Sequence, residues 1–282
     1  MHRIFAILLL FAAIGLASAG YPKKDVVTIL ATNLESATVD NYENANETED
    51  VEEPDIDMKI VHGADAEPGD FPYTVSLRLW NQHFCGGSII ARNVILTAAH
   101  CITTGSSNIN NMTVVTGTIY RTKGGESHKV SAMYYLKNYD GSRDLGIVKI
   151  ADNIRFNDRQ RSVALATTRP PANAYAVVSG WGGTTSTPPF MPADRQQYLN
   201  VKMLSPQDCR KEYSDITTEV CTVSTSDQGI CSGDSGGPLV YKGEVVGVVS
   251  RAVLCAKGYP DVFASVYDNR DFILSIMRQI VN

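Results

Sequence analysis

Short apolar runs separated by turn residues dominate the chain after residue 60. Four of them lie at residues 75–79, 88–90, 114–116 and 245–249, and Gly, Pro and Asn occur between the runs. Many brief strands of this kind predict an all-β sandwich or barrel. The end of the chain differs, because residues 271–278 place apolar side chains at helical spacing and so predict a closing helix packed on the core.

The first residues follow another pattern, with a basic head, an apolar run and a closing Ala17-Ser18-Ala19. Small residues at this point suit a signal peptidase, and the apolar run is too short to span a membrane stably. We therefore expect residues 1–19 to be a signal peptide and the product to be secreted and extracellular. An uncleaved anchor is the alternative.

Residues 20–59 are acidic and contain few large apolar side chains. They hold eleven acids and three bases, so the formal net charge of −5 belongs to this segment, and residues 60–282 carry 19 acids and 21 bases. Such a segment buries too little apolar surface to offset its chain entropy. We expect a flexible acidic prosegment, with a linker of no regulatory role as the alternative. The remainder has no basic block, which argues against nucleic-acid binding.

Length and cysteine content narrow the class of protein further. The chain has 282 residues, 44% of them apolar, which is enough for one or two domains with an ample core. Six cysteines in a secreted chain predict three disulfides and no spare thiol, although sequence alone allows about 15 pairings. A zinc site is the alternative, but the sequence has no Cys-x-x-Cys or paired Cys/His cluster.

The strongest chemical signal is Gly233-Asp234-Ser235-Gly236-Gly237-Pro238. A serine attacks a carbonyl only if its hydroxyl is exposed and nearby amides point at the oxyanion, which requires a tight glycine-rich turn. By itself the motif is equally consistent with an ordinary turn. A second segment, Leu96-Thr97-Ala98-Ala99-His100-Cys101, places a histidine among small residues, and a lone histidine of this kind is more often structural.

Together the two segments resemble the trypsin and chymotrypsin family of serine proteases, across essentially all of residues 60–282. The family has an aspartate between the two motifs, and Arg143-Asp144-Leu145-Gly146 matches it in order and spacing. The resemblance implies two packed six-stranded antiparallel β-barrels with a C-terminal helix. It also implies a serine endopeptidase that hydrolyses peptide bonds through an acyl-enzyme.

The resemblance assigns a role to each of these residues. Ser235 would be the nucleophile, His100 the general base and then acid, and Asp144 the buried carboxylate that orients the imidazole. The backbone amides of Gly233 and Ser235 would form the oxyanion hole.

A further match concerns activation. Lys59-Ile60-Val61-His62-Gly63 resembles the family's activation junction, so cutting after Lys59 would free the α-amino group of Ile60 to pair with Asp234. The chain would then be a zymogen that an enzyme of tryptic preference activates. The resemblance also implies three disulfides that leave no cysteine to tether the prosegment, which should depart: Cys85–Cys101, Cys209–Cys221 and Cys231–Cys255.

The substrate pocket departs from ordinary trypsins. Gly229 stands six residues before Ser235, where trypsins carry an acid, and Asp261 stands where most relatives have Gly. This combination resembles the brachyurin subgroup, the collagenolytic crustacean enzymes and their insect relatives. It implies a broad or chymotrypsin-like preference for large apolar residues with some acceptance of Arg, Lys or Gln. Alternatively, Asp261 is a solvated turn acid.

The other wall of the predicted pocket comes from Ser250, Arg251 and Ala252. The family usually has Trp at the position of Arg251. A cation there would weaken apolar binding and favour acidic residues upstream of the scissile bond. A merely solvated side chain is an equal alternative.

The remaining expectations concern ligands and partners. We expect no cofactor, no metal, no membrane contact and a monomer that meets protein or peptide substrates, an activating trypsin-like protease and serpin-type inhibitors. Asn46 and Asn111 begin tripeptides of the N-glycan acceptor form. A non-catalytic protease homologue that binds a partner is the main alternative function, although such proteins usually lose a triad residue. An inhibitor or lectin on an unrelated β fold is a further alternative.

Overall fold

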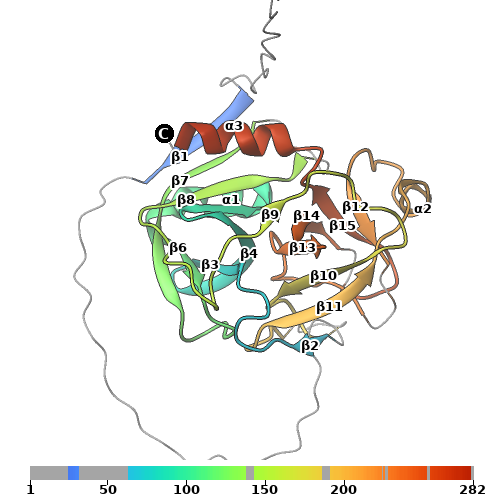
Figure 1. Ribbon diagram of the computed structural model, residues 1–282, viewed down its shortest axis with the longest axis horizontal. Helices are drawn as coiled ribbons and strands as arrows, with labels where there is room; N and C mark the ends of the chain where they lie inside the picture. Colours follow the sequence, from blue (N-terminus) through green and yellow to red (C-terminus); the bar gives the residue numbers. More distant parts are fainter. Residues whose placement is uncertain are drawn as a thin grey trace, which may run out of the picture.

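Two β-sheets lie side by side in the computed structural model (Figure 1). The structure describes residues 25–31, 63–137, 143–185, 191–223, 225, 228–252 and 255–280. The predicted signal peptide, Asn46, Lys59 and Ile60 lie outside the described residues.

The first sheet closes on itself, because β7 pairs with both β6 and β8. Its strand order is β1-β7-β6-β3-β4-β5-β8, so six strands form the ring and β1 is added to it. Apolar side chains such as Leu77, Ile95 and Ile147 fill this barrel and are fully buried. The seven strands are β1 (Val26–Leu30), β3 (Thr74–Leu79), β4 (Gln82–Ala91), β5 (Val94–Thr97), β6 (Met112–Thr116), β7 (Glu126–Leu136) and β8 (Gly146–Ile150).

The second sheet has the order β12-β15-β14-β13-β10-β11-β2, with β9 beside β14. Beyond the strand pairings, β11 and β12 meet through an isolated bridge between Met203 and Thr222 and through a hydrogen bond from Val223 N to Lys202 O of 2.7 Å. Its strands are β2 (Ala64–Asp65), β9 (Ala164–Leu165), β10 (Tyr175–Gly180), β11 (Gln197–Lys202), β12 (Val220–Thr222), β13 (Pro238–Tyr241), β14 (Glu244–Arg251) and β15 (Asp261–Ser265).

The helices in the described residues are short and lie outside the barrels. The last, α3, buries Phe272, Ile273 and Ile276 and lies against β8 of the first barrel, although it follows the second barrel in sequence (Figure 1). None of these helices combines the length and apolarity needed to cross a membrane. They are α1 (Ala99–Gly105), the 3-10 helix η2 (Ser106–Asn111), α2 (Pro206–Glu212) and α3 (Arg270–Ile280).

The predicted fold class is confirmed, and the four apolar runs lie in β3, β4, β6 and β14. One segment differs from expectation. Part of the prosegment that we expected to be flexible, residues 25–31, lies against the first barrel and contains strand β1. The reason is local composition, because Val26-Val27-Thr28-Ile29-Leu30 is β-branched and apolar while most of the acids of the segment follow it.

The structure contains the three disulfides that the resemblance implied: Cys85–Cys101, Cys209–Cys221 and Cys231–Cys255. They close loops with sequence separations of 16, 12 and 24 residues. Each loop of this size restricts the unfolded chain enough to contribute roughly 3 kcal/mol in the entropy model. All three lie within the part of the chain that forms the barrels.

Candidate active site

His100 and Asp144 are brought together by strand pairing in the first barrel. His100 is the second residue of α1, which follows β5, and Asp144 lies two residues before β8. Because β5 and β8 pair antiparallel with Thr97 opposite Gly146, the end of one strand lies beside the start of the other. His100 Nδ1 lies 2.7 Å from Asp144 Oδ2, and the His100 amide donates to Oδ1 at 2.9 Å.

A third donor reaches Asp144 from the second barrel. Ser250 Oγ, on β14, donates to Asp144 Oδ2 at 2.8 Å, so the carboxylate joins the two barrels. Asp144 is 4% exposed. Since a carboxylate only accepts, His100 Nδ1 carries the proton and the Nε2 lone pair is available to take another.

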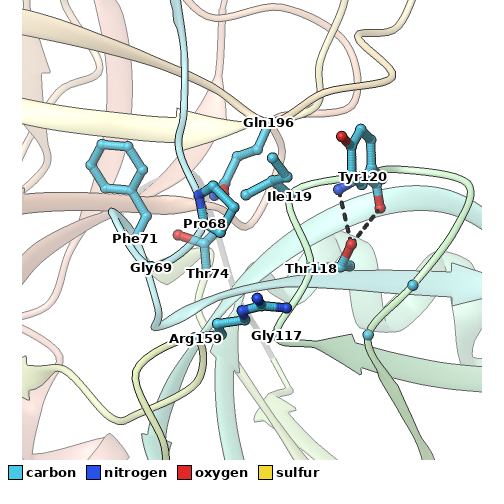
Figure 2. A pocket seen from close by; sticks show the side chains of 12 residues that line it. Pro68, Gly69, Phe71, Thr74, Gly117, Thr118, Ile119, Tyr120, Arg159 and Gln196 are labelled. Atoms are coloured by element: carbon cyan, nitrogen blue, oxygen red, sulfur yellow. Dashed lines mark hydrogen bonds between the residues drawn. The ribbon is translucent and has the colours of Figure 1, made fainter.

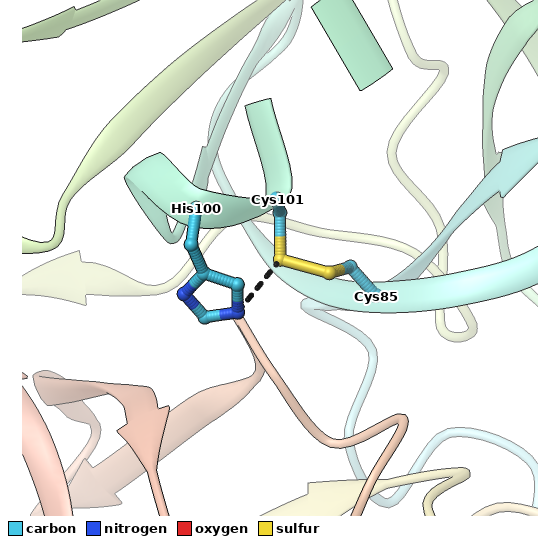
Figure 3. Close-up of side chains that lie close together, drawn as sticks. All are labelled: Cys85, His100 and Cys101. Atoms are coloured by element: carbon cyan, nitrogen blue, oxygen red, sulfur yellow. Dashed lines mark hydrogen bonds between the residues drawn. A yellow bond between two sulfur atoms is a disulfide. The ribbon is translucent and has the colours of Figure 1, made fainter. Parts of the chain in front are cut away.

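The surroundings of His100 also decide whether this site is a metal centre. Cys85, His100 and Cys101 place their ligand atoms within 4.8 Å of one another, and Nε2 lies 3.6 Å from Cys101 Sγ (Figure 3). Both sulfurs are consumed in a disulfide, however, and a disulfide is not a thiolate ligand. This cluster therefore does not fit a zinc ion.

Ser235 lies in the tight turn that its glycines predicted. Gly233 and Gly236 have φ angles of +100° and +78°, a region that other residues rarely adopt. At Gly236 a Cβ would lie 2.2 Å from Thr97 Oγ1, so this position also lacks room for a side chain. The turn is held by Gly86 N, which donates to Ser235 O at 2.7 Å.

A cavity of about 400 Å³ opens beside this turn, and Ser235 and Ser250 both line it. Because Ser250 is bonded to Asp144, the cavity, the Ser235 turn and the His100–Asp144 pair belong to one site. No hydrogen bond joins Ser235 Oγ to His100 in the described structure. Nine residues line the cavity: Ile230, Cys231, Ser232, Ser235, Val249, Ser250, Arg251, Ala252 and Cys255.

Asp234 is buried directly behind the turn, with 1% of its surface exposed. Its carboxylate accepts from Gly182 N at 2.8 Å and from Cys231 N at 3.0 Å. Burial nevertheless raises its pKa to about 6, because desolvation outweighs the two backbone hydrogen bonds. A Cβ on Gly182 would lie 2.2 Å from Asp234 Oδ2, so glycine is required there.

His83 is a functional candidate that the sequence analysis missed. Its Nε2 lies 3.0 Å from Gly233 O and its Nδ1 lies 2.9 Å from Ser76 Oγ. Burial, with the charges of Arg121 and Arg78, lowers its pKa to about 4, so the ring is neutral at pH 7. Nε2–H then donates to Gly233 O and Nδ1 accepts from the Ser76 hydroxyl. No local pattern marks this residue, because it lies within an ordinary strand.

The predicted pocket residues separate into two groups. Ser250, Arg251 and Ala252 line the cavity, whereas Gly229 and Asp261 do not. Asp261 is 2% exposed and lies behind Ile230, whose amide donates to Asp261 Oδ2 at 3.1 Å. Burial, assisted by the charge of Asp234, raises the Asp261 pKa to about 7. Asp261 is therefore not the solvated turn acid of the alternative interpretation.

Arg251 is held by neighbours rather than extended into solvent. Its Nη1 lies 2.9 Å from Asp215 Oδ2, and its guanidinium lies 5.2 Å above the Tyr213 ring. The hydrogen bond to Asp215 raises the pKa of Arg251 above its ordinary value. The Arg251 cation at the cavity wall is thus paired with Asp215. Neither the substrate-binding interpretation nor the solvated-side-chain interpretation of Arg251 includes this ion pair.

A second cavity lies apart from this site. It has a volume of about 210 Å³ and lies between the segment from Pro68 to Thr74 and the glycine-containing loop from Gly117 to Gly125 (Figure 2). Within the loop, Tyr120 N donates to Thr118 Oγ1 at 2.9 Å. Arg159 is the charged residue of its lining, which contains no carboxylate and so offers no acidic ligand to a cation.

Comparison with known proteins agrees with this geometry. The family model described as Trypsin matches residues 60–273. Trypsin delta of Drosophila erecta is 36% identical over 232 residues, which cover 78% of this chain and 89% of the relative. Hypodermin-A of Hypoderma lineatum is 34% identical over 234 residues, covering 79% and 90%.

A solved structure also matches. Neuropsin, a serine protease expressed in the limbic system of mouse brain, superposes with a TM-score of 0.70 and 26% sequence identity. The match covers 77% of this chain and 99% of neuropsin.

Proposed function

Because this chain belongs to the trypsin family of serine proteases, we propose that residues 60–282 form a secreted serine endopeptidase. The observation that carries the proposal is the 2.7 Å contact between His100 Nδ1 and Asp144 Oδ2, beside a cavity that Ser235 lines. A protein or peptide substrate would bind along this cavity. The protease would act as a monomer outside the cell, where serpin-type inhibitors would meet the same site.

The chemistry follows from the proton positions. Ser235 Oγ attacks the carbonyl carbon of the scissile bond while His100 Nε2 takes the hydroxyl proton. Asp144 stabilises the resulting imidazolium through Nδ1–H. His100 then gives the proton to the leaving amine, and a water deprotonated by the same nitrogen attacks the acyl-enzyme to free Ser235.

The amides of Gly233 and Ser235 would stabilise the oxyanion of the tetrahedral intermediate. Each such donor is worth about 2.7 to 4 kcal/mol of barrier lowering in comparable enzymes. The positive φ of Gly233 and the His83 hydrogen bond to Gly233 O support this role, because together they set the direction of the turn's peptide groups. His83 is therefore a positioning residue in this proposal.

Activation would occur by cleavage after Lys59. The new ammonium group of Ile60 would pair with Asp234, whose pKa is raised to about 6 by burial. A cation beside that carboxylate would offset its desolvation and hold the Ser235 turn in shape. An enzyme of tryptic preference would make the cut.

The specificity that we propose is of the brachyurin type, broad or chymotrypsin-like. A pocket wall of Val249, Ile230 and Ala252 suits a large apolar side chain. Asp261, one residue layer behind Ile230, would supply a carboxylate for an occasional Arg, Lys or Gln. Because Arg251 is paired with Asp215, its attraction for acidic residues upstream of the scissile bond would be weak.

An active-site probe tests the catalytic proposal. A fluorophosphonate should label the chain cut after Lys59 and leave the uncut chain unlabelled. Ser235→Ala should abolish labelling, whereas Ser232→Ala, at a second serine lining the same cavity, should retain it. Labelling that survives Ser235→Ala, or is absent from the cut wild-type chain, would disprove the proposed nucleophile.

A further inference from the structure

Strand β7 is longer than its neighbour β6, which pairs only with the first residues of β7. β6 pairs with Glu126–Lys129 and ends there, whereas β7 continues to Leu136. β8 pairs with β7 from Val130 to Tyr135. The stretch from Ala132 to Tyr135 pairs with β1 as well, so β1 occupies the edge opposite to β8.

Backbone hydrogen bonds fix the register of this added strand. Val26 lies opposite Leu136 and Leu30 opposite Ala132 in an antiparallel pair. Lys137 N donates to Asp25 O at 2.8 Å, and Ala31 N donates to Ser131 O at 3.0 Å, at the two ends of the pair. Because hydrogen-bonded pairs alternate along an antiparallel ladder, the amides of Val27 and Ile29 face β7 and that of Thr28 faces away.

Side chains add an apolar contact to the ladder. Val26, Ile29 and Ala31 are partly buried against the main hydrophobic core, whereas Thr28 and Leu30 are exposed. β1 also contacts η2, which lies next to it along the barrel surface. Residues 25–31 are thus held by both backbone and apolar contacts, although they precede the activation junction.

We propose that the leader remains bound by β1 after the chain is cut, so that the activated protease is a two-chain complex without a covalent link. This proposal rests on the proposed activation at Lys59. All six cysteines are paired within residues 85–255, so no disulfide joins the leader to the barrels. The recognition is the addition of a β-strand to an open sheet edge.

The bound leader would protect the barrel rather than inhibit the enzyme. No residue of β1 or β7 lines the cavity beside Ser235. Without β1, the outer backbone groups of Ser131 to Leu136 would form an unpaired edge, which invites pairing with other chains. Retention of the strand would cover that edge in the mature enzyme.

The experiment uses the full chain with Ser235→Ala, to prevent self-digestion, and an affinity tag after Asn282. After limited cleavage with trypsin, the protein is captured, washed and analysed by mass spectrometry without reductant. We expect a leader fragment containing residues 25–31 in about equal amount to the protease domain. Loss of that fragment from the washed, cut protein overturns the proposal.

Two proline variants form a matched pair. Val27→Pro removes an amide that faces β7 and should leave at least about tenfold less leader on the column. Thr28→Pro removes an amide that faces away, and edge strands tolerate proline at such a position, so it should retain the leader. Equal retention by both variants would show that β1 pairing does not hold the fragment.

The two proposals fail in distinguishable ways. Sequencing the amino terminus of the captured domain shows whether the cut lies after Lys59. Lys59 is the sole Lys or Arg between residues 32 and 62, so the domain should begin at Ile60. If the wild-type chain cut there is not labelled by a fluorophosphonate, activation at Lys59 is disproved, and the capture still tests the docked strand. Hydrogen exchange on the uncut chain gives an independent measurement, in which rapid exchange of the Val27 and Ile29 amides would contradict β1 pairing.

Discussion

Two carboxylates with almost equal burial differ in how the fold surrounds them. Asp144, before β8, is 4% exposed and accepts from three donors, whereas Asp261, at the start of β15, is 2% exposed and accepts from the Ile230 amide. The pKa of Asp261 is raised to about 7. Burial alone therefore does not define the role of a buried acid, because the donors decide whether its orientation is fixed.

The largest expected effect is on kcat, which should fall when Asp144 is replaced but not when Asp261 is replaced. Asp144→Asn should lower kcat about 10⁴-fold, because an amide in place of the carboxylate favours the wrong His100 tautomer. Asp261→Asn should change kcat on a substrate with Phe before the scissile bond by less than about threefold, because Asp261 touches no group of the proposed triad. Steady-state kinetics of both variants test this, and equal losses would contradict the assigned roles.

The second effect concerns stability and pH. The pKa of Asp261 is about 7 in the folded state against an ordinary value of 3.8, so the folded protein binds more protons between these values. Its contribution to stability is therefore fully present below about pH 4 and is lost as the pH rises to about 7, by on the order of 4 kcal/mol.

Urea denaturation of the Ser235→Ala protein at several pH values measures this loss. Asp261→Asn should reduce the decline between pH 4 and pH 7 and leave the part that Asp234 contributes, since burial raises the Asp234 pKa to about 6. Asp158→Asn, at an exposed acid, should leave it unchanged and serves as the control. A decline that persists unchanged in Asp261→Asn would assign it to other groups.

A third prediction concerns specificity. The ratio of kcat/KM for a substrate with Lys to one with Phe should rise about tenfold as the pH passes through about 7, because ionised Asp261 attracts the cation. In Asp261→Asn, or in Asp261→Gly, the ratio should be low and independent of pH. A loss on both substrates alike would remove Asp261 from specificity.

The smallest expected effect concerns the hydrogen bond from Ser250 to Asp144. Ser250→Ala removes one of three donors and should lower kcat only about fivefold, because the two bonds from His100 remain. Ser232→Ala, at another serine of the same cavity, is the control. A loss as large as that of Asp144→Asn would mean that Ser250 alone orients the carboxylate.

Much of the fold and of the proposed triad was predictable from short segments. The apolar runs that became β3, β4, β6 and β14 have the composition of strands, and the glycines around Ser235 demand the turn that it occupies. The helical spacing of residues 271–278 likewise predicted α3. These features depend on residues close together in the chain, so a linear pattern is sufficient to encode them.

Other features depended on which distant segments meet. His83 contacts Gly233, which lies 150 residues away, and nothing in its strand predicts that contact. The pairing of Arg251 with Asp215 likewise arises only when the loop that follows α2 lies beside the end of β14.

The amino-acid sequence by itself thus determined the strands and the turn around Ser235, and through family resemblance it indicated the three proposed catalytic residues and the disulfide partners. Tertiary structure decided the burial of Asp261 behind Ile230, the neutral state of His83 and the docking of β1 on β7. The physical reason is that conformation follows from neighbours along the chain, whereas desolvation and strand pairing follow from the surfaces that close around a group.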